Sequence, residues 1–246
     1  MSDVLGFAAE WPAPPRVRTL CTVRAGGVST GEWASLNLGD HCGDDPAHVA
    51  ENRRRVVATM GVAPRWLRQV HGTAVASDTA PALIEADACW TRRVGVACAV
   101  LTADCLPLLF CHRTEPVVAA AHAGWRGLAA GVVEATVRDM AVDPSGLLVW
   151  LGPAIGPDAF EVGEEVRAAF LAADPAAGLA FRPGSPGKWW ADLYRLARQR
   201  LARMGVHTVF GGGLCTVEDP VRFFSHRRDH GRTGRMGNFI WMDPEP

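Results

Sequence analysis

Apolar residues gather along the chain in short continuous runs, and Gly, Pro or Asp bounds each run. Runs of this length that lack strict apolar–polar alternation are typical of strands covered on both faces. The pattern therefore predicts a buried sheet. The predicted strands are 17–23, 66–70, 94–101, 106–111, 117–121, 147–151 and 206–210.

Segments between these runs carry helical periodicity instead. Asp45 can cap a helix start and Pro46 fits the first helical position, and Gly61 can end the same helix. Apolar residues at helical spacing predict further helices over 126–140, 162–173 and 190–204. Residues 176–187 hold two prolines and three glycines, which predicts a surface loop. Strands and helices occur throughout, so we expect one α+β domain over 1–246.

Composition excludes several classes of protein. The 246 residues are 48% hydrophobic and 21% charged, as in ordinary globular chains. The net charge of −1 argues against a nucleic-acid binder, and no apolar run approaches the roughly 20 residues of a membrane span. The seven cysteines form no CxxC pair, and no basic and then apolar leader opens the chain. We therefore expect a cytoplasmic protein with reduced thiols.

One cysteine and two histidines stand at the ends of predicted strands. His71, Cys105 and His122 are too far apart for a local metal loop, but they can converge from three strand ends. A thiolate and two imidazoles suit Zn²⁺ with an open fourth position. The same trio could instead be a cysteine nucleophile with a histidine base, or buried structural residues.

Copper oxidation of phenols is a further possibility for a Cys/His set. Multinuclear copper enzymes need many imidazoles, typically in His-x-His pairs. The eight histidines of this chain form no such pair, so we expect no multicopper site.

Two basic segments could bind an anion. Arg24 precedes Gly26 and Gly27, whose backbone can approach an anion closely. Residues 223–229, FFSHRRD, group aromatic, hydroxyl and basic side chains. Each segment could equally be a solvated turn or basic patch. No P-loop and no GxGxxG fingerprint is present.

Taken together, these motifs resemble the bacterial laccase-domain (YfiH-type) family, also called the purine nucleoside phosphorylase or polyphenol oxidase family. The resemblance extends from about Thr22 to Trp241, in family order. The matching stretches are TVRAGGVS at 22–29, SLNLG at 35–39, QVHG at 69–72, TADCLP at 102–107, HAGWRG at 122–127, LGPAIGPDAFEV at 151–162, CT at 215–216, and FFSHRRD with TGR within 223–235.

The resemblance implies a layered α/β/β/α sandwich with mixed sheets, distantly like the catalytic domains of cytotoxic necrotizing factors. It implies that His71, Cys105 and His122 are catalytic and hold zinc, with copper the less favoured metal. Substrate and phosphate would contact a second set of residues. That set is Arg24, Asn37, Arg126, Ser225, His226 and Arg227.

The implied reaction is phosphorolysis of adenosine, inosine, guanosine or methylthioadenosine to a free base and a pentose 1-phosphate, with adenosine deamination at the same site. The implied partners are a purine nucleoside and phosphate, and we expect a monomer. The alternatives are a metal-independent Cys–His thiol hydrolase or deamidase, a copper-dependent polyphenol oxidase and a peptidoglycan-precursor editing enzyme.

Overall fold

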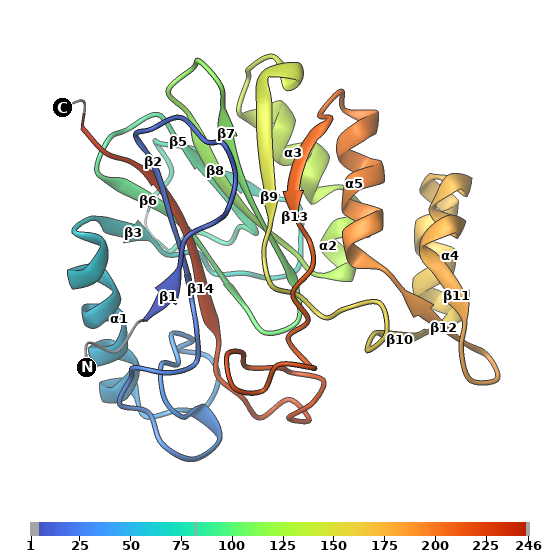
Figure 1. The fold of residues 1–246 in the computed structure, drawn as a ribbon, viewed down its shortest axis with the longest axis horizontal. Helices are drawn as coiled ribbons and strands as arrows, with labels where there is room; N and C mark the ends of the chain where they lie inside the picture. The colour runs from blue at the N-terminus through green and yellow to red at the C-terminus, as the bar shows by residue number, and fades with distance from the viewer. Residues whose placement is uncertain (1–4, 82, 245–246) are drawn as a thin grey trace.

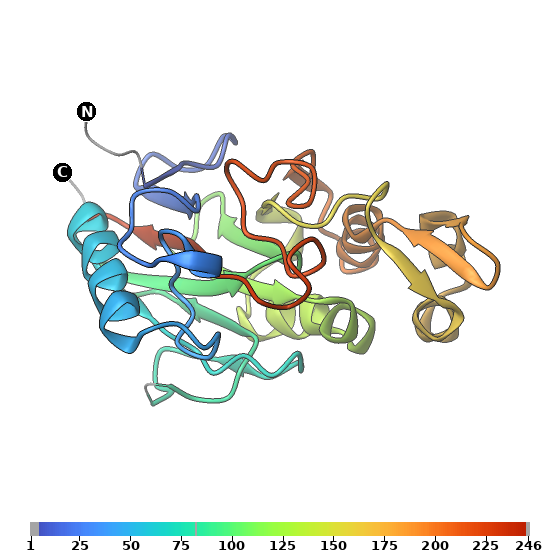
Figure 2. The same cartoon turned by 90° about the horizontal axis from the view of Figure 1, so that it is seen from below.

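Two large β-sheets lie face to face at the centre of the computed structural model, which describes residues 5–81 and 83–244 (Figures 1 and 2). The first sheet has the order β1 (Gly6–Phe7), β2 (Val17–Thr22), β14 (Met236–Met242), β6 (Val96–Thr102) and β3 (Ala63–Arg65). The second has the order β13 (Thr208–Gly211), β9 (Leu147–Leu151), β7 (Leu106–His112), β8 (Val118–Ala123), β5 (Ala88–Thr91) and β4 (Val75–Ala76). Both sheets mix parallel and antiparallel pairs.

Helices cover the outer faces of the two sheets. Helix α1 (Pro46–Met60) packs on the first sheet, and α2 (Trp125–Ala130), α3 (Val132–Asp139) and α5 (Leu193–Arg203) pack on the second. Alternate residues of β7 serve two cores, because Leu108 faces the helices and Leu109 faces the other sheet. The expected α/β/β/α layering is confirmed.

A small lobe extends from one end of the sandwich (Figure 2). It contains the sheet β10 (Glu161–Gly163), β12 (Lys188–Ala191) and β11 (Phe181–Pro183), together with α4 (Glu164–Ala173). Three short 3-10 helices complete the elements: Gly31–Trp33, Pro144–Gly146 and Pro175–Ala180. No helix among the described residues is long and apolar enough to cross a membrane.

Most of the predicted strands are confirmed, with ends shifted by a residue or two. The helix that begins after Asp45 is also confirmed: the Asp45 carboxylate accepts from the Ala47 amide, and Gly61 ends the helix at φ 70°. The strands β1, β3, β4, β5 and β14 are not among the predicted ones.

Four predictions are wrong in part. Helix 126–140 is two helices, because Gly131 adopts φ 104° between them. The predicted helices 162–173 and 190–204 begin later, since their first residues pair with each other as β10 and β12. The predicted loop 176–187 contains a 3-10 helix and β11.

The predicted strand 66–70 is wrong as well. Its backbone forms only one isolated bridge, between Arg68 and Glu85. The Gln69 side chain takes the place of a strand neighbour, because its amide both donates to the Leu101 carbonyl and accepts from the Leu101 amide. This contact fixes the segment that leads into His71.

Candidate metal centre and substrate cavity

The three predicted ligands converge at one edge of the sandwich. One ligand atom from each of the three residues lies within 4.8 Å of the other two, and Cys105 Sγ is 3.7 Å from His71 Nε2. His71 follows the Gln69 segment at φ 60°, Cys105 lies in the bend between β6 and β7, and His122 lies near the end of β8. Among the described residues, this is the one group of three or more Cys, His, Asp or Glu with such spacing.

Asp87 orients two of these ligands from beneath. Its carboxylate lies 2.8 Å from His122 Nδ1, and accepts hydrogen bonds from the amides of Val70, His71 and Gly72. The Asp87 side chain is fully buried. The bond to Nδ1 leaves His122 Nε2 for a metal, an arrangement typical of protein metal sites.

Electrostatics favour a thiolate at Cys105. Burial opposes the charged form, but the neighbouring His122 and His71 outweigh it and lower the pKa of Cys105 to about 6. Burial likewise lowers the pKa of His122, but the charges and hydrogen bonds of Cys105 and Asp87 raise it overall to about 9. Asp87 keeps a lowered pKa despite its burial, because His122 and the amides of Gly72 and Val70 hydrogen-bond to it. The deprotonated sulfur is the form that binds a metal.

Glycines leave room for this cluster. A Cβ on Gly124 would lie 2.8 Å from His71 Cδ2 and 2.9 Å from Cys105 Sγ. A Cβ on Gly127 would lie 2.9 Å from the Gly72 carbonyl oxygen. The HAGWRG segment therefore packs against His71 and Cys105 at a distance that only glycine allows. The donor set and its spacing fit a zinc-sized ion.

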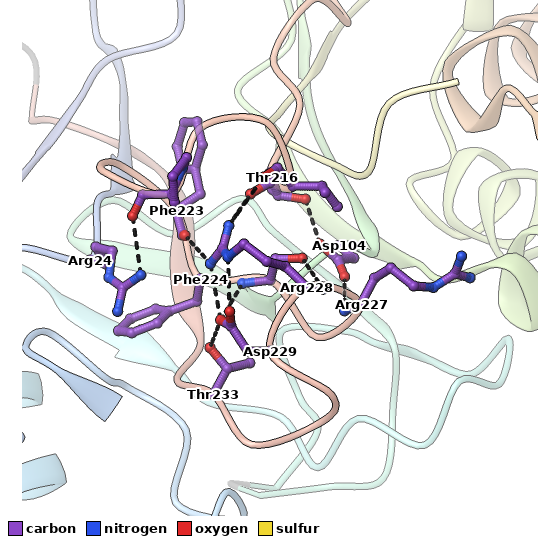
Figure 3. Close-up of polar contacts among 12 residues, drawn as sticks. Arg24, Asp104, Thr216, Phe223, Phe224, Arg227, Arg228, Asp229 and Thr233 are labelled. Carbon is purple, nitrogen blue, oxygen red and sulfur yellow. Dashed lines mark hydrogen bonds and ion pairs between the residues drawn. The ribbon is translucent and has the colours of Figure 1, made fainter. Parts of the chain in front are cut away.

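The cluster opens into a cavity of about 500 Å³, within the range of small-molecule sites. Three guanidinium groups line it, from Arg126, Arg227 and Arg235, and none of them forms an ion pair with a carboxylate among the described residues. Asp104 also lines the cavity. Its carboxylate already accepts from Thr216 Oγ1 and the Arg227 amide, as Figure 3 shows. The positive charge of the three guanidinium groups at the wall therefore favours an anionic ligand.

Three of the six expected substrate residues lie at this cavity: Arg126, His226 and Arg227. Arg24 does not line it. Its guanidinium donates to the backbone carbonyls of Ala34 and Pro220 and stacks 4.9 Å from the Phe224 ring. Figure 3 shows the guanidinium groups of Arg24 and Arg227 on opposite sides of the loop.

Asn37 and Ser225 are also away from the cavity wall. Asn37 is fully buried and bonds to Gly39, to Asp44 and to the amide of Arg235. Ser225 is fully buried too, and its hydroxyl accepts from the Arg228 amide. These side chains hold the loops in place, so the geometry does not support direct contact with substrate.

Sequence reasoning missed several residues of the site. Asp87 stands in a segment with no pattern that would single it out. Arg235 ends the TGR stretch of the family resemblance, but it is not among the expected substrate residues, and the fold brings it to the cavity. Asp104 precedes a predicted ligand, and its φ of 82° is a signal that the sequence does not display.

Comparisons with known proteins agree with this geometry. The sequence model of a family described as multi-copper polyphenol oxidoreductase laccase matches residues 18–243. A Pseudomonas aeruginosa protein named purine nucleoside phosphorylase is 56% identical over 234 residues, covering 95% of this chain and 96% of that protein. Purine nucleoside phosphorylase YfiH of Escherichia coli is 54% identical over 237 residues, covering 95% and 97%.

Solved structures of similar proteins superpose closely on this chain. The crystal structure of a Neisseria meningitidis protein superposes with a TM-score of 0.95 at 50% identity, covering 98% of this chain and 100% of that one. YlmD from Geobacillus stearothermophilus superposes with a TM-score of 0.89 at 34% identity, covering 95% and 94%.

Proposed function

The chain belongs to the family described as multi-copper polyphenol oxidoreductase laccase, and from its cavity we propose that it is a zinc-dependent purine nucleoside phosphorylase. Its relatives in Pseudomonas aeruginosa and Escherichia coli carry the name purine nucleoside phosphorylase. One observation carries the proposal: a Cys–His–His cluster lies at the wall of a cavity that also holds three guanidinium groups, none of them paired with a carboxylate in the part of the chain that the structure describes. The cluster suits a metal ion, and the guanidinium groups suit phosphate.

In this proposal His71, Cys105 and His122 hold the zinc. A bound Zn²⁺ would supply a Lewis acid at the cavity wall. The Asp87 carboxylate orients the His122 ring, and through the His71 amide it fixes the loop of a second ligand. The protein part of the site is thus held in place before substrate arrives.

Phosphorolysis needs phosphate and nucleoside in contact. A phosphate oxygen bonds to C1′ of the sugar, the bond from C1′ to the purine nitrogen breaks, and its electron pair leaves with the purine, which takes up a proton. We assign phosphate binding to Arg126, Arg227 and Arg235, whose guanidinium groups can form paired hydrogen bonds with it. His226 would contact the nucleoside from the same wall.

The proposed substrates are adenosine, inosine, guanosine and methylthioadenosine. We also propose that the cavity deaminates adenosine, with water adding at C6 of the base and ammonia leaving. All seven cysteines are free thiols. This agrees with our proposal of a cytoplasmic enzyme, because the cytoplasm keeps thiols reduced.

The decisive experiment incubates zinc-loaded protein with adenosine, with and without phosphate, and follows adenine, ribose 1-phosphate and inosine. We expect ribose 1-phosphate only when phosphate is present, in an amount equal to the adenine plus any hypoxanthine released from the inosine that deamination forms. Inosine should form in both mixtures. Zinc-loaded protein that releases no base in the presence of phosphate would contradict the proposed phosphorolysis.

The pKa values at the cluster favour one alternative, a thiol hydrolase with Cys105 as nucleophile and His122 as base. Metal dependence separates the two functions. A phosphorylase of the proposed kind loses activity on chelation and regains it with zinc. A thiol hydrolase works without metal and is stopped by alkylation of Cys105.

A further inference from the structure

A second cavity of about 310 Å³ adjoins the first. The two share four wall residues: Trp125, Arg126, Phe160 and Arg227. The rest of the second cavity comes from the small lobe, from β10, the start of α4 and Lys188 of β12. It therefore lies where the lobe meets the sandwich, on the far side of two arginines from the main cavity.

Three cations face this space. Arg126 stacks 4.4 Å from the Trp125 ring, and Arg227 stacks 5.4 Å from the Phe160 ring while it donates to the Glu161 carbonyl. Lys188 is exposed at the rim, and it is the one lysine among the 25 basic residues of the chain. None of the three forms an ion pair among the residues that the structure describes.

Two carboxylates line the same cavity, and both have other neighbours. Glu161 accepts from the Ser185 amide and hydroxyl, which together with nearby Lys188 and Arg227 lower its pKa. The Glu165 carboxylate folds back over Gly163 at the start of α4, since a Cβ on Gly163 would clash with it. Three cations against two carboxylates leave one positive charge toward the cavity.

We propose that this second cavity binds a phosphate group, with Lys188 as its outer cation and Arg126 and Arg227 between it and the main cavity. The inference rests on the proposed phosphorolysis, and it adds a second place, beside the main cavity, at which the anion binds. Two sources share this chemistry: inorganic phosphate as co-substrate, and the 5′-phosphate of a nucleotide in the main cavity. A tetrahedral dianion suits the space because three cations from separate elements line it.

The single lysine allows a test that needs no turnover. Limited acetylation with acetic anhydride, followed by peptide mass spectrometry, reports the reactivity of Lys188 and of the chain's α-amino group in one sample. We expect inorganic phosphate to slow acetylation of Lys188 by about threefold or more relative to chloride of equal ionic strength, and to leave the α-amino group unaffected. Equal acetylation of Lys188 in phosphate and chloride would overturn the proposal.

Parallel samples with adenosine and with adenosine 5′-phosphate separate the two sources. If free phosphate is the ligand, inorganic phosphate protects Lys188 and the nucleotide adds nothing at equal phosphate concentration. If a nucleotide is the ligand, adenosine 5′-phosphate protects at lower concentration than inorganic phosphate. Protection by adenosine alone would also overturn the proposal, because it would show that the nucleoside body occupies this space.

Kinetics supply the second readout, with Lys188→Gln, Lys188→Arg and Arg195→Gln. Arg195 is exposed on α5, lines neither cavity and so serves as the charge-matched control. We expect Lys188→Gln to raise the phosphate KM about threefold to tenfold with kcat and nucleoside KM unchanged, and Lys188→Arg to restore it. An unchanged phosphate KM in Lys188→Gln would exclude free phosphate as the ligand. If phosphorolysis itself is absent, the acetylation result still decides whether the cavity binds a phosphate group.

Discussion

A single buried carboxylate, that of Asp87, controls two of the three candidate metal ligands. It holds the His122 ring through Nδ1 and the His71 loop through backbone amides. Cys105 has no such support, and its position comes from the bend between β6 and β7. Metal affinity at this site is therefore a property of four residues, of which only three would touch the ion.

Loss of the thiolate should empty the centre. We expect about one zinc per chain in the wild type, and a large loss of zinc in Cys105→Ala, because a soft ligand is removed from a three-ligand site. Cys111→Ala serves as the control, since Cys111 is buried between the sheets on the neighbouring strand. Metal analysis of the three purified proteins gives the comparison. Equal zinc in Cys105→Ala and wild type would rule out this ligand.

The lowered pKa of Cys105 predicts its reactivity. In metal-free protein the thiolate forms as pH rises through about 6, whereas an ordinary cysteine needs a pH near 9. The rate of alkylation by iodoacetamide should thus rise to half its maximum near pH 6 and fall below that pH as the sulfur is protonated. Mass spectrometry of the Cys105 peptide measures the rate. Zinc should protect this residue, and a midpoint near pH 9 would contradict the ion pair with His122.

Among the elements, the loop 223–229 combines side chains with very different roles. Arg227 faces the cavities, whereas Arg228 pairs with Asp229 and donates to the carbonyls of Thr216 and Phe223. Arg24 supports the same loop through Pro220 and Phe224. A basic segment in the sequence is thus divided by the fold into one ligand-facing side chain and a structural framework.

This division predicts different effects for two arginine variants. Arg24→Ala should lower the free energy of unfolding by about 1–3 kcal/mol, the usual loss for charged hydrogen bonds, and leave the phosphate KM near the wild-type value. Arg126→Ala should raise the phosphate KM about tenfold with little change in stability. Thermal melts and phosphate titrations on the same preparations test both. A raised phosphate KM in Arg24→Ala would return that residue to the binding site.

Elements whose signals are local could be predicted from the sequence. Helix α1 is one, because Asp45 and Gly61 mark its ends within the chain itself. Strands β10 and β12 could not, since each depends on pairing with the other. Strand β14 reads MGNFIWM, and its Gly and Asn obscure the apolar run.

At the site too, local signals could be predicted from the sequence, and contacts made by the fold could not. The convergence of His71, Cys105 and His122 could be predicted, because each stands beside a breaker at the end of an apolar run. The glycines beside Arg24 favour a role in phosphate binding. In the fold, its guanidinium donates to backbone carbonyls instead, and the sequence alone does not show which carbonyls lie within its reach. Arg235 lines the cavity, and its backbone is held by the side chain of Asn37, 198 residues earlier in the chain, which accepts from its amide.

At the scale of the whole molecule, the sandwich offers one metal centre among the described residues. Multicopper oxidation needs several coppers in electronic contact, and the chain lacks His-x-His pairs. We therefore expect phenol oxidation far below the rate of phosphorolysis, with no more than one copper bound per chain after copper loading. Oxygen uptake with a phenol substrate measures this. Rapid copper-dependent uptake with several coppers per chain would contradict the single-centre reading and favour the activity in the family's description.

Strand β14 lies between β2 and β6, although it follows every other strand in the chain. Its Asn238 donates to Thr102 Oγ1, 136 residues earlier. During synthesis β1 and β2 therefore cannot join β6 and β3 in one sheet until β14 has been made. By then His71, Cys105 and His122 have already left the ribosome. Contacts of such long range make folding slow. A newly made chain carries the thiol and both imidazoles before the first sheet can close, and zinc present at that stage would meet an unfinished site.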